Sequence, residues 1–269
     1  MSDQPASIAV HRHHAMATVF EVRIAGEEPA FAAQAAHAAF DVVDKLERLM
    51  SRFNPDSEIS ALARLHPGDS FQLSEPTASC LALALDVEAQ TDHAFSLAAT
   101  ASRTGHAPAR WTLDPATRMV TVHEGLCLLD LGAIGKGFAL DRMAEELREW
   151  GCPSFLLVAG GSSVLAGAPP PQTEAWTARL SDPARPDAPA ESIALAHAAL
   201  GSSGLALQGN HITDPRTGAP ASHRRRTWVR ADSAAEADAF STALMVLDDA
   251  GSAAVAAQRP DLKTWITPA

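Results

Sequence analysis

Three groups of residues in this chain have types and spacings that could do chemistry. The first is the segment Asp130-Leu131-Gly132-Ala133-Ile134-Gly135-Lys136-Gly137, which leads into a helical pattern. A helix N-terminus offers free N–H groups and a partial positive charge to a phosphate, and Lys136 adds a full charge there. The segment is no P-loop, because Asp130 replaces the first glycine and Gly137 replaces the hydroxyl residue after the lysine, and it lacks the GxGxxG of nicotinamide-binding folds. The alternative is a purely structural glycine turn.

The second group lies where the best helical pattern of the chain begins. Ser233 and Glu236 have the spacing of a capping box, which predicts that the helix starts at Ser233. Asp238 and Thr242 then lie one turn apart on one face. A carboxylate and a hydroxyl are hard ligands suited to Mg²⁺ or Ca²⁺, which recruit carbonyls, water and phosphate as further ligands. The alternative is a solvent-facing aspartate and a threonine bonded to its own helix.

The third group is the stretch from His211 to Gly218, which contains Asp214-Pro215-Arg216-Thr217-Gly218. Asp-Pro-x-x-Gly forms a turn by its own chemistry and would make the loop after His211 rigid. A histidine on such a loop can position or deprotonate a nucleophile near neutral pH. A histidine with one structural hydrogen bond is the other interpretation.

The remaining pattern predicts the elements that position these groups. Helices are expected at 30–50, from about Ser57, at 75–91, 138–150 and 233–248, and strands at 15–25, 111–113, 119–122, 127–131, 154–167 (broken at Gly160-Gly161), 176–180, 192–200 and 226–231. Residues 1–15 are expected to be an N-terminal tail, and Arg224 to Arg226 a solvated loop. No repeat or long linker divides residues 16–269. We therefore expect one α+β domain with mainly antiparallel sheets flanked by helices.

Composition excludes several classes of function. The 269 residues carry a formal net charge of −11, which argues against a nucleic-acid surface. Three cysteines without ligand spacing indicate reduced, buried thiols rather than disulfides or a zinc site. No stretch is long and apolar enough for membrane insertion, and the start of the chain is unlike a signal peptide. A cytoplasmic protein is expected.

Taken together and in order, the motifs resemble the FAD:protein FMN transferase (ApbE) family. The matching segments span about residues 16 to 245 and are Met16-Ala17-Thr18, Ser51 to Ser60, Asp130 to Gly137 with Asp141, Ala159-Gly160-Gly161, His211 to Gly218, and Ala237-Asp238 to Thr242. The resemblance implies a single α+β domain with an FAD cleft between two halves.

The resemblance also implies roles for individual residues. Asp238, Thr242 and the carbonyl of Ala133 would bind Mg²⁺, with Ca²⁺ as the alternative. His211 and Lys136 would serve catalysis. The FAD contacts would be Met16, Phe53, Ala94, Phe95, Ser96, Asp130, Lys136 and Thr213.

The implied reaction transfers FMN from FAD to a Ser or Thr hydroxyl of an acceptor protein and releases AMP. Two alternatives remain at this stage. One is an FAD pyrophosphatase that gives FMN and AMP, and the other is a flavin-binding protein without catalysis.

Overall fold

The computed structural model describes residues 7–98, 107, 109–181, 187, 190–205, 212–222 and 224–268. Its elements follow in chain order: β1 (Ile8–Ala15), β2 (Thr18–Ala25), α1 (Pro29–Met50), α2 (Glu58–Leu62), β3 (Ser70–Gln72), α3 (Glu75–Gln90), β4 (Arg110–Asp114), β5 (Met119–Glu124), α5 (Gly135–Glu149), β6 (Phe155–Ala159), β7 (Ser163–Ala166), β8 (Trp176–Leu180), β9 (Glu191–Leu195), β10 (Ala198–Gly204), β11 (Arg224–Ala231), α6 (Ala234–Val246), α7 (Asp249–Gln258) and β12 (Lys263–Pro268).

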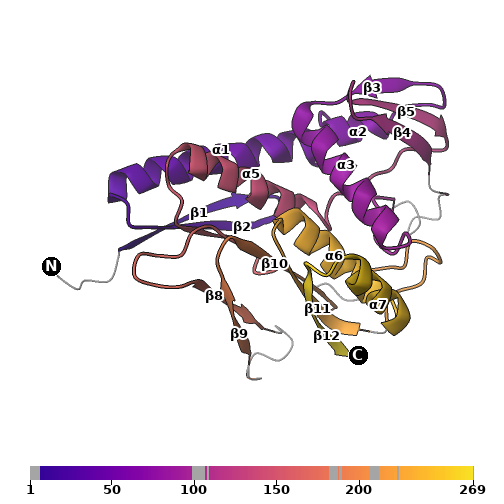
Figure 1. Cartoon of the computed structure of the whole chain (residues 1–269). Coiled ribbons are helices and arrows are strands. Elements are labelled where there is room, and N and C mark those ends of the chain that lie inside the picture. The colour runs from indigo at the N-terminus through magenta and orange to yellow at the C-terminus, as the bar shows by residue number, and fades with distance from the viewer. Residues whose placement is uncertain are drawn as a thin grey trace.

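A seven-stranded sheet with the order β1-β2-β6-β7-β10-β11-β12 is the centre of the molecule, and all of its neighbouring strands are antiparallel. The long helices α1, α5 and α6 lie over one face of it (Figure 1), while the β8–β9 ribbon lies on the other side. Each face therefore has its own buried cluster, a large one under the helices and a smaller one around Trp176 and Trp228. Because the sheet is covered on both sides, its central strands β6, β7 and β11 are buried along nearly their whole length.

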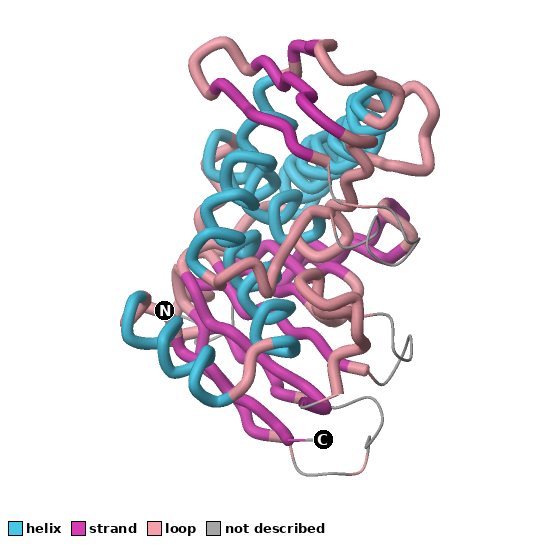
Figure 2. Tube along the Cα trace, turned by 90° about the vertical axis from the view of Figure 1, so that its right-hand side faces the viewer, coloured by secondary structure: helices cyan, strands magenta, loops and turns pink. Residues whose placement is uncertain are grey.

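A second, three-stranded sheet with the order β3-β5-β4 stands with α2 and α3 at the opposite end of the molecule from β12 (Figure 2). Its buried residues Val120 and Val122 belong to the same core as the helical face of the large sheet. The described chain is thus one α+β domain with mainly antiparallel sheets, and the expected fold class is confirmed.

Local chemistry explains the start and the close packing of the long helix α1. The carboxylate of Glu28 accepts hydrogen bonds from the N–H groups of Ala30 and Phe31, and Pro29 occupies the first turn of α1. Half of its buried stripe is alanine, with Ala32, Ala35, Ala36 and Ala39 fully buried. Small side chains on that stripe let α1 lie close to the sheet and to α5.

The N-terminal part of the structure differs from the expectation of a tail. Residues Ile8–Ala15 form β1 and pair along their whole length with β2. The turn between them consists of Met16 and Ala17, which both have positive φ (48° and 57°), the geometry of a two-residue hairpin turn. The sequence signal is weak because the run His11-Arg12-His13-His14 breaks the alternation of apolar and polar residues that marks a strand.

Three further expectations are corrected. Cys127–Leu131 is not a strand: Asp130 N–H donates to Leu97 C=O (2.9 Å), but no strand among the described residues pairs with this segment. Residues 192–200 form two strands, separated at His197, whose φ is positive. Arg224 and Arg226 are buried in β11 rather than solvated, because their guanidinium groups bond to Asp249 and Ser202.

No helix within the described residues has the length and apolar character needed to cross a membrane. The three cysteines are free and buried, as expected.

Candidate active site

The first turn of α5 crosses the first turns of α6 at very short range. The N–H of Gly137 donates to Asp238 Oδ2 (2.9 Å). A Cβ at Gly137 would lie 2.1 Å from the carbonyl oxygen of Ala234, so only glycine permits this approach. The crossing places the glycine turn and Lys136, which the sequence singled out, directly beside Asp238.

The two helices cap each other. The residue before α5, Ile134, has no capping side chain, and Asp238 of α6 supplies the missing acceptor. In return, Asp141 of α5 accepts hydrogen bonds from Ala234 N–H (2.8 Å), Ala235 N–H (2.9 Å) and Ser233 Oγ (2.8 Å) at the start of α6. Ser233 also caps its own helix through Glu236 N–H. Two carboxylates thus sit at two helix N-termini, where the helix dipoles favour negative charge.

Asp238 is a buried carboxyl with a perturbed pKa. Desolvation raises the pKa of Asp238 to about 6, although the charge of Lys136 and the hydrogen bonds from Ser163 and Gly137 lower it. Only 6% of the residue is exposed. The solvent-facing alternative for Asp238 is therefore excluded, and its charge is stabilised by few neighbours.

Thr242 follows one turn later and is partly buried. Its Oγ1 donates to the carbonyl of Asp238 (3.2 Å), as the alternative interpretation anticipated, and lies 3.0 Å from Ser203 Oγ. The hydroxyl hydrogen can be used in this way while the oxygen lone pairs stay available to a cation. Asp238 and Thr242 lie in the same polar layer between α6 and the sheet.

This donor set fits a hard cation with an incomplete protein shell. Within the described ranges, no three His, Cys, Asp or Glu side chains form a group that could hold a metal alone. The set expected from the sequence is one carboxylate, one hydroxyl and the carbonyl of Ala133 in the turn before α5. These three ligands would leave the coordination shell of a divalent ion incomplete. Mg²⁺ suits such a site because it keeps several waters and binds substrate phosphates.

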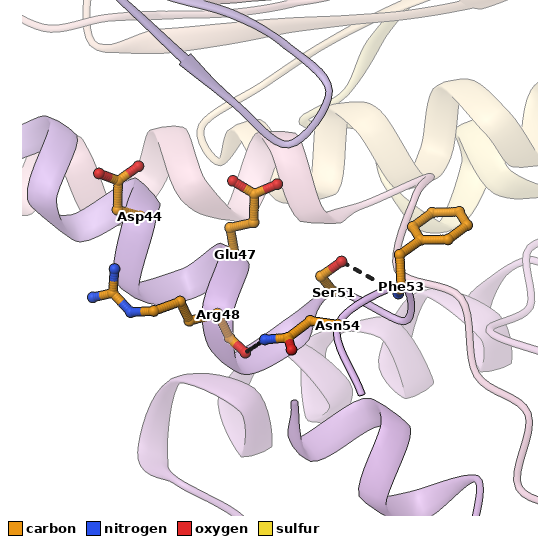
Figure 3. Close-up of a pocket in the computed structure, with 6 residues that line it drawn as sticks. All are labelled: Asp44, Glu47, Arg48, Ser51, Phe53 and Asn54. Carbon is orange, nitrogen blue, oxygen red and sulfur yellow. Dashed lines mark hydrogen bonds between the residues drawn. The ribbon is translucent and has the colours of Figure 1, made fainter. Parts of the chain in front are cut away.

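A second group of predicted residues joins this one through Asp130. Arg52 Nε lies 3.2 Å from Asp130 Oδ2, and its guanidinium carbon lies 4.1 Å from the ring centre of Phe53. Phe53 is 79% exposed, an unusual position for a phenylalanine. It borders a groove at the end of α1 that is also lined by Asp44, Glu47, Arg48, Ser51 and Asn54 (Figure 3).

The turn after α3 lies against Asp130 as well, through the bond from Asp130 N–H to Leu97 C=O. Ala94 and Phe95 are 1% and 2% exposed, so their side chains belong to the core. Ser96 is partly buried, and its Oγ accepts the N–H of Ala98 (3.1 Å). If this turn contacts a ligand, Ser96 and the backbone are the groups that can do so.

Met16 and Thr213 stand elsewhere on the fold. Met16 lies in the β1–β2 turn, and Thr18, which follows this turn, packs against Gly160, where a Cβ would lie 2.5 Å from Thr18 Oγ1. Thr213 pairs with Pro220 beside the Asp214 turn, and its Oγ1 is buried without a hydrogen-bond partner among the described residues. Such an orphaned hydroxyl fits a ligand contact. His211 lies outside the described residues.

The sequence analysis missed the hydroxyl groups beneath α6. Ser163 Oγ lies 2.8 Å from both carboxylate oxygens of Asp238, and Ser203 Oγ lies 2.8 Å from Ser241 Oγ. The available signal was the run of small and hydroxyl residues Gly201-Ser202-Ser203-Gly204, directly after the strand predicted at 192–200.

Comparison with known proteins decides the family. The family model described as "ApbE family" matches residues 16–266, nearly the whole chain. The chain belongs to the ApbE family.

Curated relatives of this ApbE family member carry the name FAD:protein FMN transferase. The protein from Klebsiella pneumoniae (strain 342) is 23% identical over 317 residues, which cover 98% of this chain and 89% of the relative. The protein from Salmonella typhimurium is 24% identical over 268 residues, covering 86% of this chain and 76% of the relative.

Solved structures of ApbE proteins share the fold. The flavin transferase ApbE from Vibrio cholerae superposes with a TM-score of 0.83 at 19% identity, covering 98% of each chain. The ApbE protein from Thermotoga maritima gives a TM-score of 0.84 at 22% identity, covering 97% of this chain and 94% of the other.

Proposed function

We propose that this chain is a Mg²⁺-dependent FAD:protein FMN transferase, which moves FMN from FAD to a Ser or Thr hydroxyl of an acceptor protein and releases AMP. The names of the curated relatives and the ApbE fold support the activity. The observation that carries it is the junction of Lys136, the first turn of α5 and the Asp238 carboxylate. These groups are the ones that a diphosphate and a cation require.

The reaction is a phosphoryl transfer in which the acceptor hydroxyl oxygen forms a bond to the phosphorus on the FMN side of FAD. The P–O bond to the AMP half breaks, and AMP leaves with the bridging oxygen. The hydroxyl proton goes to a base, for which His211 is our candidate. The products are a phosphoester-linked FMN and free AMP.

Residues of the chain hold the diphosphate and keep it in line. Lys136 and the N-terminus of α5 supply positive charge to the phosphate oxygens. Asp238, Thr242 and the carbonyl of Ala133 would hold the divalent cation, with Ca²⁺ as the alternative to Mg²⁺. When bound, the cation neutralises charge that repels the attacking oxygen and stabilises the leaving group.

The flavin and adenine parts of FAD would lie in a cleft between the two halves of the domain. Phe53 offers an exposed ring, Asp130 and Ser96 offer polar groups beside it, and Thr213 offers an unsatisfied hydroxyl. Met16, Ala94 and Phe95 complete the proposed set. The proposal keeps a cytoplasmic location, which the free cysteines suit.

The test is incubation with FAD, Mg²⁺ and a Ser- or Thr-containing acceptor peptide, followed by mass spectrometry of peptide and nucleotide. Asp238→Ala should lower AMP release by more than about 100-fold, since even residues that only orient a metal ligand typically cost 10–100-fold. The exposed Asp232, six positions earlier, gives the control Asp232→Ala, which should retain activity.

The same assay separates the alternatives. Peptide-independent release of FMN and AMP would identify a pyrophosphatase. FAD that stays intact with Mg²⁺ and acceptor would identify a binding protein. Equal activity of wild type and Asp238→Ala would remove the proposed cation site.

A further inference from the structure

The interface between α6 and the large sheet contains buried hydroxyl groups among its apolar side chains. Three hydroxyl residues of the sheet face α6, one on each of β7, β10 and β11: Ser163, Ser203 and Thr227. We call them the hydroxyl row. Thr227 Oγ1 donates to the carbonyl of Ser241 (2.6 Å), and Ser203 lies between Ser241 and Thr242. Each member therefore contacts α6 at a different point.

The backbones of β10 and α6 lie so close together that the short side chains of the hydroxyl row can reach the helix. Gly201 of β10 pairs with Ser163 of β7 and lies directly under α6. A Cβ at Gly201 would lie 2.4 Å from the carbonyl carbon of Ala237. The helix thus rests on the glycine, and the serine hydroxyl beside it reaches the carboxylate of Asp238.

Ser163 meets Asp238 in a way that fixes the plane of the carboxylate. Its Oγ is 2.8 Å from Oδ1 and 2.8 Å from Oδ2, while Gly137 N–H is bound to Oδ2. The terminal torsion of aspartate is soft, so one hydrogen bond from α5 leaves the carboxylate free to rotate. A second bond from β7 stops that rotation. Because each carboxylate oxygen has two lone pairs, lone pairs remain for a cation.

We propose that Ser163 is a positioning residue for the divalent cation: its hydroxyl group holds the Asp238 carboxylate in the orientation in which it binds the ion. The inference rests on the proposed cation site and adds a residue that does not touch the ion. Ser163 is 1% exposed and forms the first residue of a strand, so its own position is well determined. Removal of its hydroxyl should weaken ion binding more than folding.

The experiment measures Mn²⁺ binding directly, by the electron paramagnetic resonance of the free ion, in the full chain without FAD. Ser163→Ala should raise the dissociation constant for Mn²⁺ about 10–100-fold, the typical effect of losing a partner that orients a metal ligand. The matched control is Ser154→Ala. Ser154 is also a buried serine, and its Oγ donates to the carbonyl of Pro169 (3.0 Å), away from the site.

Two comparisons make the result decisive. Asp238→Ala should abolish binding, and Ser154→Ala should leave the constant within about twofold at a similar loss of thermal stability. If Asp238→Ala abolishes binding but Ser163→Ala does not weaken it, the role of Ser163 is refuted and the cation site stands. If Asp238→Ala binds Mn²⁺ like wild type, or wild type binds none, both the site and the role of Ser163 are refuted.

A second pair of variants answers the case in which Ser163→Ala does not fold. Ser163→Thr and Ser163→Val have nearly the same shape and differ in the hydroxyl group, and both suit a strand. The threonine variant should bind Mn²⁺ more tightly than the valine variant by about 10-fold or more. Equal affinities would overturn the inference.

Discussion

At the scale of single residues, the site depends on a carboxyl group that the fold has placed in an unfavourable environment. Asp238 is buried, and its pKa is raised to about 6 by desolvation. Functional groups are often found in such environments. The spacing of Asp238 and Thr242 was readable from the sequence because it is local. The role of Ser163 could not be predicted from the sequence, since this residue lies 75 positions from Asp238 and no local pattern marks it.

The raised pKa predicts how the stability of the metal-free protein depends on pH. The folded state holds the Asp238 proton more tightly than the unfolded state does, so the free energy of unfolding should fall as pH rises from about 4 to about 6 and then level off. At about 1.4 kcal/mol for each pKa unit, the loss should approach 3 kcal/mol. Asp238→Asn keeps the shape of the side chain and removes this proton.

Thermal melts in EDTA between pH 4 and 7 would measure the effect. The stability of Asp238→Asn relative to wild type should increase with pH up to about 6. A difference that stays constant over this range would show that Asp238 titrates near its ordinary value.

At the scale of elements, the mutual capping of α5 and α6 explains why the start of α6 was predicted correctly and the start of α5 was predicted three residues too late. The start of α6 was predicted correctly because Ser233 is a local cap. α5 begins at Gly135, three residues before the expected 138, because its cap is Asp238, which lies 101 positions after Gly137. Cys127–Leu131 was predicted as a strand because it is apolar, but in the part of the chain that the structure describes no strand pairs with it.

Gly137 should therefore be intolerant of any side chain. Gly137→Ala should destabilise the protein by about 3 kcal/mol or more, because the new Cβ would lie 2.1 Å from a backbone oxygen that cannot move independently. Gly135→Ala is the control in the same turn, where a Cβ would meet only Leu131 Cβ at 3.7 Å. It should be neutral or stabilising, since alanine favours helix. Urea denaturation of both variants checks this, and equal losses would contradict the packing explanation.

At the scale of the whole molecule, the two faces of the large sheet have different roles in our proposal. The helical face carries the candidate site. The opposite face is covered by the β8–β9 ribbon through Trp176, Leu180 and Leu195. The α+β class followed from the mixture of patterns in the sequence. The strand order did not, because pairing between distant strands such as β2 and β6 depends on contacts that no local pattern encodes.

The β8–β9 ribbon should contribute to the free energy of unfolding and have little effect on the proposed reaction. Trp176 is 5% exposed, and its indole N–H donates to the carbonyl of Ala168 (2.9 Å). Trp176→Ala should cost about 3–5 kcal/mol. The exposed neighbour Thr177 gives the control Thr177→Ala. At a temperature where all three proteins are folded, their rates of AMP release should agree within about twofold, and a selective loss in Trp176→Ala would place part of the site on this face.

The separation of Gly137 and Asp238 along the chain has a consequence for when the proposed cation site can first form. Neither half of the pair has the other as a neighbour until α6 has docked on β10, which requires the last third of the polypeptide. A nascent chain that ends before α6 lacks Asp238 and Thr242 and therefore cannot form the proposed cation site. Saturating Mg²⁺ should accordingly protect the completed chain from unfolding and leave such fragments unchanged, because an ion that binds only the native state stabilises only that state.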